Sequence, residues 1–292
     1  MICIENDLLK VEVAELGAEV RSVIHKDTKI SYMWNGDAAY WGRVSPVLFP
    51  IVGRLKNNQY KAEGNRYELS QHGFLRDAAF KVSHTTKSAV TFTLESNGSF
   101  KEIYPYEFRV EIAYQLDNDK LSVEWRVTNL EQAKTMYFSI GAHPAFRLPL
   151  LSGEETADYK LQLKPVQHKQ VTAYELVDGL IRESGQPTEL PVMTVNAHLF
   201  ENDALVYDHI EEVHLQSDNG NGVAVTMSGF PFVGIWSKYD KTEKTMAPFI
   251  CIEPWFGIAD TVEATGELSE KAGVQQLQPR SDFHSVYTMT FY

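Results

Sequence analysis

The chain has 292 residues, of which 43% are hydrophobic and 23% are charged. This composition is typical of a globular protein and excludes the disordered and fibrous classes. The formal net charge is −12, from 27 Lys and Arg against 39 Asp and Glu, and the basic residues form no continuous stripe. Such a surface repels phosphate backbones and anionic lipids, so we expect no nucleic acid and no membrane partner.

The cysteines and the first residues indicate the compartment. Cys3 and Cys251 are the two cysteines, too few and too far apart for a disulfide framework. Residues 1–20 mix acidic and apolar side chains without a basic segment followed by an apolar run, so they predict a first strand rather than a signal peptide. No segment approaches the roughly 20 apolar residues that cross a bilayer. We therefore expect a soluble, cytoplasmic protein.

Apolar and polar side chains alternate with a period of two in several segments, which is the pattern of half-buried strands. The clearest segments are 90–94, 110–114, 121–127 and 223–227. Turn-forming residues separate such segments, and they lie at 97–98, 117–119, 178–179 and 218–222. The pattern predicts an all-β fold, a large antiparallel β-sandwich.

Helical patterns are few and short. The best is 267–277, although Gly273 lies inside it and weakens a helix. An α/β fold would need crossover helices that the sequence does not supply. There is no internal repeat and no long linker, and the most polar connection, 151–158, is predicted to be a loop. Residues 1–292 are therefore predicted to form one β-sandwich domain.

Three parts of the chain place a titratable group beside Gly or Pro within apolar sequence, where burial can shift a pKa. The first combines 49–54 with 71–74 and supplies Arg54 and His72, a donor-rich pair suited to hydroxyl groups. The alternatives are an exposed strand start for Arg54 and a simple turn for His72.

The second part, 141–146, contains His143 just before a proline, and we expect this histidine at an inward-facing strand end. Imidazole both gives and takes a proton near neutral pH, as general acid catalysis requires. The alternative is a core histidine with satisfied hydrogen bonds. The other seven histidines lack a comparable context.

The third part, 252–257, contains Glu253 among apolar neighbours, so its pKa should be raised unless it has partners. Trp255 is two residues further on. Aromatic faces stack on sugar rings while a carboxylate bonds hydroxyl groups, so Trp255 is a candidate substrate-binding residue. The alternative is a structural acid paired with the backbone or an Arg.

Motifs for metals, nucleotides and serine nucleophiles are absent. The sequence contains no CxxC, HxxxH or HExxH spacing, no GxGxxG or P-loop, and no GxSxG. We therefore expect neither a metal site nor a cofactor.

The segments 49–54, 72–73, 141–146 and 251–255, in this order, resemble the aldose 1-epimerase family and, within it, the galactose mutarotase-related branch that includes LacX-like proteins. The resemblance covers nearly the whole chain. It implies a large antiparallel β-sandwich, in agreement with the strand pattern.

The resemblance also implies roles for single residues. His143 corresponds to the general acid of the family and Glu253 to its general base, while Arg54 and His72 correspond to sugar-binding residues. An Asp contacts the sugar in the family. Asp203 matches the related branch and is favoured, whereas Asp208 lies in a segment similar to true galactose mutarotases.

The implied reaction is mutarotation of a free aldose. A base removes the proton of the anomeric hydroxyl, an acid protonates the ring oxygen, and the ring opens and recloses without metal or cofactor. The second histidine of well-studied galactose mutarotases lies in an Asn-His context, where this chain has Ala142-His143. The identity of the sugar is therefore open.

Three other functions fit part of the pattern. A non-catalytic carbohydrate-binding protein would use the same aromatic and polar groups. A glycoside hydrolase would pair Asp203 with Glu253. A hexose-6-phosphate epimerase would need a phosphate pocket built from Arg43, Arg54 and Arg76. The sequence leaves monomer and homodimer equally open.

Overall fold

The computed structural model describes residues 1–182 and 185–292, and antiparallel strands dominate it. The helices of the described part are short 3-10 turns, none longer than four residues. They are η1 (Lys56–Asn58), η2 (Leu75–Asp77), η3 (Thr156–Asp158), η4 (Ala197–Phe200) and η5 (Leu268–Glu270). The all-β prediction is confirmed.

The largest sheet has nine strands, and its long central strands bury every second side chain. In β10, for example, Leu121, Val123, Trp125 and Val127 are buried, as their alternation predicted. In spatial order the strands are β19 (Met193–Thr194), β14 (Tyr159–Pro165), β21 (Ile210–Ser217), β22 (Gly222–Thr226), β28 (Asp282–Phe291), β10 (Lys120–Asn129), β9 (Phe108–Asp117), β8 (Ala89–Glu95) and β7 (Lys81–Thr85).

The second sheet has eight strands and carries the candidate site. In spatial order they are β18 (Gln186–Thr188), β15 (Val171–Tyr174), β20 (Leu205–Asp208), β23 (Phe232–Trp236), β26 (Phe249–Phe256), β12 (Ile140–Ala142) and β4 (Val47–Leu48), and β13 (Ala145–Arg147) also pairs with β26. Since β26 has strands on both sides, its backbone is fixed along most of its length.

Smaller sheets complete the fold. One has three strands, β1 (Ile2–Glu5), β2 (Leu9–Val13) and β3 (Val20–His25). The others are two-stranded: β5 (Gln59–Ala62) with β6 (Asn65–Glu68), β11 (Met136–Phe138) with β27 (Gln275–Leu277), β16 (Leu176–Val177) with β17 (Leu180–Ile181), and β24 (Tyr239–Asp240) with β25 (Thr245–Met246).

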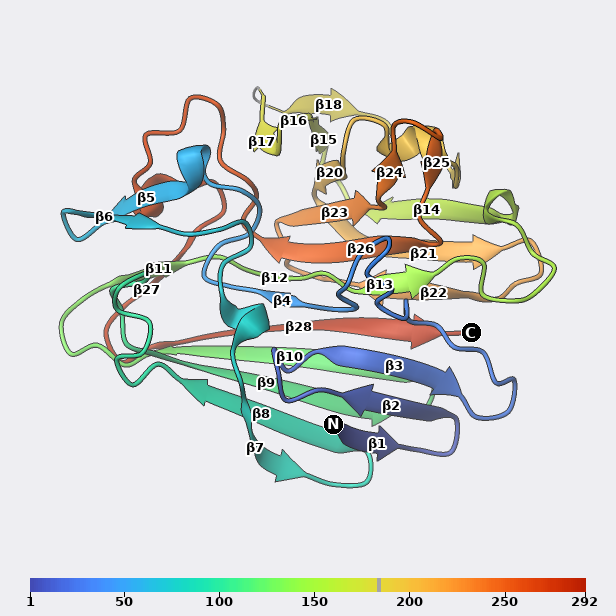
Figure 1. Cartoon of the computed structure of the whole chain (residues 1–292), viewed down its shortest axis with the longest axis horizontal. Helices are drawn as coiled ribbons and strands as arrows, with labels where there is room; N and C mark the ends of the chain where they lie inside the picture. The colour runs from blue at the N-terminus through green and yellow to red at the C-terminus, as the bar shows by residue number, and fades with distance from the viewer. Residues whose placement is uncertain (183–184) are drawn as a thin grey trace.

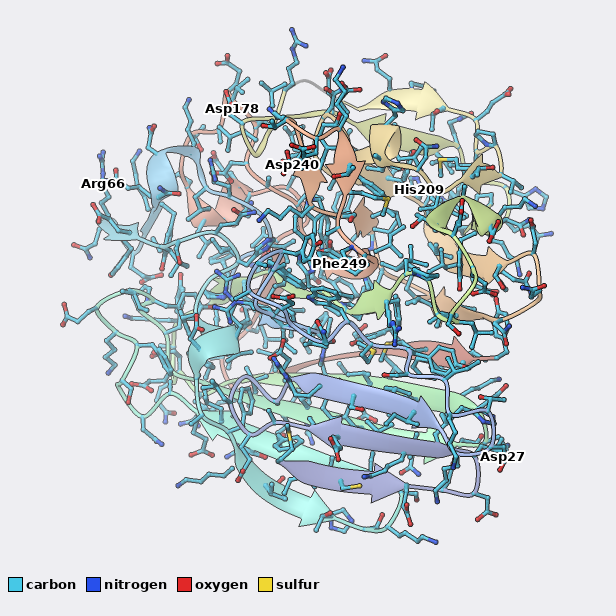
Figure 2. All side chains as sticks on the ribbon, turned by 45° about the vertical axis from the view of Figure 1, so that its right-hand side comes forward. Asp27, Arg66, Asp178, His209, Asp240 and Phe249 are labelled. Carbon is cyan, nitrogen blue, oxygen red and sulfur yellow. The ribbon has the colours of Figure 1, made fainter. Side chains whose placement is uncertain are left out.

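The sheets share one large apolar core. Figure 1 shows the three-stranded sheet lying over β8 and β9, with the eight-stranded sheet above them in the view. Val11, Trp125 and Ile252, one from each of the three largest sheets, belong to the same cluster of buried side chains. In Figure 2 Phe249 lies among packed side chains at the centre, whereas Asp27 and Arg66 lie at the periphery.

Tight turns use the residues that the sequence pattern predicted. Asn118 has a φ of +52° in the turn between β9 and β10, and Asp178 and Gly179 have φ values of +53° and +79° between β16 and β17. Asn, Asp and Gly adopt this left-handed region at low cost. Residues 151–158 form the expected loop, which ends in η3.

The predicted helix at 267–277 is wrong. The segment contains only η5, and its last residues form β27, which pairs with β11. Between them Gly273 has a φ of +71°, and a Cβ there would lie 2.7 Å from the ring of Phe232. Tertiary pairing and this close approach override a weak local preference for helix.

Candidate active site

A cavity of about 460 Å³ opens beside β26 and brings together four of the residues that the sequence singled out. They are His72, His143, Glu253 and Trp255. Asp203 also borders this cavity, near its opening. Segments that lie up to about 180 positions apart in the chain therefore meet at one hollow, as their shared sequence context suggested.

Strand alternation aims Glu253 at the cavity. Ile250 and Ile252 of β26 point into the main core, so Cys251, Glu253 and Trp255 share the opposite face. Glu253 is 1% exposed and lies opposite Gly234 of β23. Its backbone position is held by the strands on either side.

Two glycines make room for the indole of Trp255. A Cβ on Gly234 would lie 2.2 Å from the Trp255 ring, and a Cβ on Gly141 of β12 would lie 2.6 Å from it. Real Cβ atoms do not approach that closely, so any larger residue on either flanking strand would displace the ring. The indole therefore lies across its neighbouring strands at the cavity wall.

His143 contacts Glu253 directly. The imidazole lies between β12 and β13, and its Nε2 is 3.1 Å from Oε2 of Glu253. Trp41 tilts over the ring with centroids 4.7 Å apart, and Trp236 meets it edge-on at 5.7 Å. The pair is thus screened from water on its aromatic side.

Burial shifts the pKa values of the two groups toward their neutral forms. Burial lowers the pKa of His143 to about 3, and the positive charges of Arg76 and Arg43 act in the same direction. Burial also raises the pKa of Glu253 well above its usual range, reinforced by Asp203. Burial therefore favours a neutral imidazole beside a neutral carboxyl group, a pair that holds one proton jointly.

His72 presents a fixed donor beside this pair. Its ring meets that of His143 edge-on, with centroids 5.6 Å apart. Nδ1 accepts a hydrogen bond from the backbone N–H of Gly53 at 3.1 Å, and burial keeps the pKa of His72 well below its usual range. The imidazole is therefore neutral with its proton on Nε2, which lies 3.2 Å from the side-chain amide of Gln71.

Comparisons with known proteins identify the family of the chain. The family model described as "Aldose 1-epimerase" matches residues 1–273. The chain belongs to the aldose 1-epimerase family.

Three relatives illustrate the similarity. Protein LacX, chromosomal, from Lactococcus lactis subsp. lactis is 31% identical over 298 residues, which cover 98% of each chain. The structure of a galactose mutarotase related enzyme from Lactobacillus acidophilus has a TM-score of 0.93 at 37% identity, covering 100% of this chain and 97% of the other. Galactose mutarotase from Homo sapiens is 24% identical over 220 residues, covering 67% of this chain and 63% of its own.

Arg54 does not line the main cavity. Its guanidinium is exposed and donates to the backbone oxygen of Asp178 at 3.0 Å. It borders an adjoining hollow that shares Asp203, Trp236 and Gln71 with the main cavity. The structure thus places Arg54 at the mouth of the site and not beside the acid–base pair.

The two candidate aspartates differ in position. Asp203 lies at the mouth and is exposed as a whole residue. Desolvation by the surrounding protein nevertheless raises the pKa of its carboxyl group. Asp208 does not border the cavity. Its carboxylate accepts from Thr172 N–H at 2.7 Å and from the Tyr174 hydroxyl at 3.1 Å, and it pairs with His209. Asp208 is therefore a structural acid.

Sequence reasoning missed the two tryptophans Trp41 and Trp236, which line the cavity. Trp41 comes from a loop that reads as polar surface, and Trp236 ends an otherwise ordinary strand. The sequence suggested Arg76 only as a phosphate ligand, yet its side chain borders the cavity and its buried Nε has no hydrogen-bond partner among the residues that the structure describes. An unexplained Trp in a polar loop was the available signal for Trp41.

A buried ion pair holds one wall of the cavity. Nζ of Lys271 lies 3.1 Å from Oδ1 of Asp260, and the two side chains are 1% and 5% exposed. The other carboxylate oxygen of Asp260 accepts from the backbone N–H of Lys56 at 3.0 Å. Lys271 also donates to the backbone oxygen of Ile258, which lines the cavity.

The same pair is coupled to His72 through the backbone. Asp260 N–H donates to the Arg54 carbonyl at 2.9 Å. Gly53, which bonds His72, packs so closely on the adjacent loop that a Cβ would lie 2.5 Å from Cα of Ala259. Displacing the loop at 258–260 would therefore move the residue that fixes the His72 tautomer.

We expect Lys271→Met to lower the free energy of unfolding by about 3–5 kcal/mol, because it leaves the buried Asp260 carboxylate without its cation. Urea unfolding measures the change. The double variant Lys271→Met/Asp260→Asn keeps an acceptor for Lys56 N–H and should lose less. Equal stability of the single variant and the wild type would contradict a structural role for the pair.

Proposed function

We propose that the chain is an aldose 1-epimerase that interconverts the α and β anomers of a free aldose by opening and closing the sugar ring. The observation that carries the proposal is the 3.1 Å contact between His143 Nε2 and Glu253 Oε2 at the cavity. Family membership supports the reaction class. Neither group needs a metal or cofactor to transfer a proton.

The proton inventory of the pair suits this reaction. The pair has two forms, carboxylic acid with neutral imidazole and carboxylate with imidazolium. Both forms contain the same single proton. Movement of that proton from Glu253 to His143 converts the first form into the second. Binding of a sugar therefore needs no proton from solvent to create the base and the acid together.

The reaction follows from the second form. The Glu253 carboxylate removes the proton of the anomeric hydroxyl, and the His143 imidazolium donates its proton to the ring oxygen as the bond between that oxygen and C1 breaks. The open chain rotates about its C1–C2 bond. Proton transfers in the opposite sense then close the ring to either anomer, and the pair holds one proton throughout.

Other residues orient the sugar in this proposal. The neutral His72 donates from Nε2 to a hydroxyl, and Asp203 and Arg54 bond hydroxyls near the mouth. Trp255 supplies an apolar surface for a sugar face, to which the structure adds Trp41 and Trp236. A sugar held between aromatic walls and fixed polar groups lies in one orientation toward Glu253.

The charges around the cavity favour a neutral sugar over a sugar phosphate. Arg43 donates to Asp77 at 2.8 Å, and Nε of Arg76 lies 3.8 Å from the same carboxylate. Asp77 thus offsets one of the two guanidinium charges that a phosphate would need. A carbohydrate-binding protein without catalysis would not require the buried acid–base contact.

We also propose that the protein acts in the cytoplasm. Cys3 and Cys251 are both free thiols. No helix in the described part of the chain is long and apolar enough to span a membrane. The partner implied by the site is the small-molecule sugar.

Glu253→Gln and His143→Asn should each lower kcat for mutarotation by roughly 100-fold or more, because each removes one partner of the proton transfer. Polarimetry on fresh α-glucose and α-galactose measures the rate, and circular dichroism checks the fold. His198→Asn changes an exposed histidine outside the cavity and serves as the control. A rate near that of the wild type for either active-site variant would refute the assignment.

Neutral aldohexoses should be turned over with a higher kcat/KM than their 6-phosphates, because Asp77 offsets part of the positive charge of Arg43 and Arg76. Asp77→Ala should shift the ratio toward the phosphates, whereas Asp27→Ala, at the periphery, should not. The measurement compares glucose, galactose and their 6-phosphates. A strong preference of the wild type for the phosphates would identify a hexose-6-phosphate epimerase instead.

A further inference from the structure

Cys251 lies directly behind the acid–base pair, a position that the reaction does not use. It precedes Glu253 by two residues on β26 and shares its face of the sheet. One ligand atom each from His143, Cys251 and Glu253 lie within 4.8 Å of one another, and all three residues are buried. An imidazole, a thiol and a carboxyl group are ligands that Zn²⁺ binds in proteins.

We propose that His143, Cys251 and Glu253 form a binding site for a thiophilic divalent metal ion such as Zn²⁺, and that occupancy of this site inhibits the enzyme. The ion would occupy the lone pairs of His143 and Glu253 that accept the proton in the proposed reaction. The binding itself does not depend on the proposed function, whereas the inhibition rests on it.

The spacing of the ligands suits a tetrahedral ion. Bonds of about 2.0–2.3 Å to N, O and S place neighbouring ligand atoms roughly 3.3–3.5 Å apart. His143 Nε2 and Glu253 Oε2 are already 3.1 Å apart. The thiol sulfur lies within 4.8 Å of a ligand atom of each of the other two residues, so coordination would need it to come up to roughly 1.3 Å closer. Water would take the fourth position.

Two further features support the site. Among the described residues, the buried Oε2 of Glu253 has no hydrogen-bond partner besides its 3.1 Å contact with His143 Nε2, so coordination would use its remaining lone pair. Around Cys251 the side chains are apolar, with Trp34 and Phe249 in the same buried cluster. Exclusion of water from one side strengthens the attraction between a cation and anionic ligands.

The cavity provides the path of entry. His143 and Glu253 border it, whereas Cys251 is 0% exposed. An ion entering from solvent therefore meets the acid–base pair first and the sulfur last. Coordination releases two protons, one from the thiol and the one that the pair holds, so that the anionic sulfur and carboxylate balance the charge of the ion.

The test titrates Co²⁺ and then Zn²⁺ into the full chain in the absence of sugar. We expect Co²⁺ to produce a thiolate-to-cobalt charge-transfer band in the near ultraviolet, which Zn²⁺ removes. Cys251→Ser should abolish the band. Cys3→Ser, which changes the exposed cysteine, should retain it. Absence of the band, or a band that survives in Cys251→Ser, would overturn the site.

A second readout uses mutarotation. Zn²⁺ should inhibit the wild type reversibly, with EDTA restoring the full rate. Cys251→Ser should retain activity but need at least about 10-fold more Zn²⁺, since even partners outside the coordination shell change metal affinity by roughly 10–100-fold. If Cys251→Ser does not fold, the measurement uses Cys251→Ala in its place. Equal inhibition of wild type and variant would refute the thiol ligand.

The two readouts separate the two proposals. A cobalt band without any mutarotation in metal-free protein would refute the proposed function and leave the metal site standing. Mutarotation without a band would refute the metal site alone.

Discussion

The contact between Glu253 and His143 is the interaction on which the site depends. A buried carboxylate or a buried imidazolium alone would need a counter-ion, because a low-dielectric interior penalises an isolated charge. Together the two groups remove that need, since one proton makes both of them neutral. The same proximity allows the charged form to appear with its two charges adjacent. The shared proton thus allows both side chains to be buried, and it is also the proton that the proposed reaction uses.

The surrounding sheet makes this contact possible. Strand β26 is paired on both sides, with one row of side chains in the main core and with Glu253 and Trp255 of the other row at the cavity. The alternation that packs Ile250 and Ile252 into the core therefore also places Glu253 at the site. Close backbone approaches complete the geometry, because Gly141 and Gly234 admit the Trp255 ring. The same alternation of side chains along β26 therefore builds the core and positions the site.

Features written into local sequence were predictable. Period-two alternation identified β8, β9, β10 and β22, and apolar context alone singled out His143 and Glu253. Family resemblance supplied the roles that context could not. These signals work because strand burial and an acid in apolar surroundings each leave a mark within a few residues.

Features that depend on distant segments were not predictable. The guanidinium of Arg54 turns to Asp178, which comes from a hairpin 124 positions later. Trp41 reaches His143 from a loop, and Lys271 pairs with Asp260 from the residue after η5, in a segment whose pattern predicted a helix. Each of these contacts is fixed by strand register and by the paths of the loops. The local sequence pattern contains no information on either.

The central claim is that the shared proton serves anomer exchange, and exchange NMR on an equilibrium mixture of anomers tests it most directly. The anomeric C1 protons of galactose and glucose report the exchange without any coupled assay. The account predicts cross-peaks between α and β signals whose intensity rises with protein concentration and which Glu253→Gln removes while the protein stays folded. Exchange no faster than the spontaneous rate for every free aldose would contradict it.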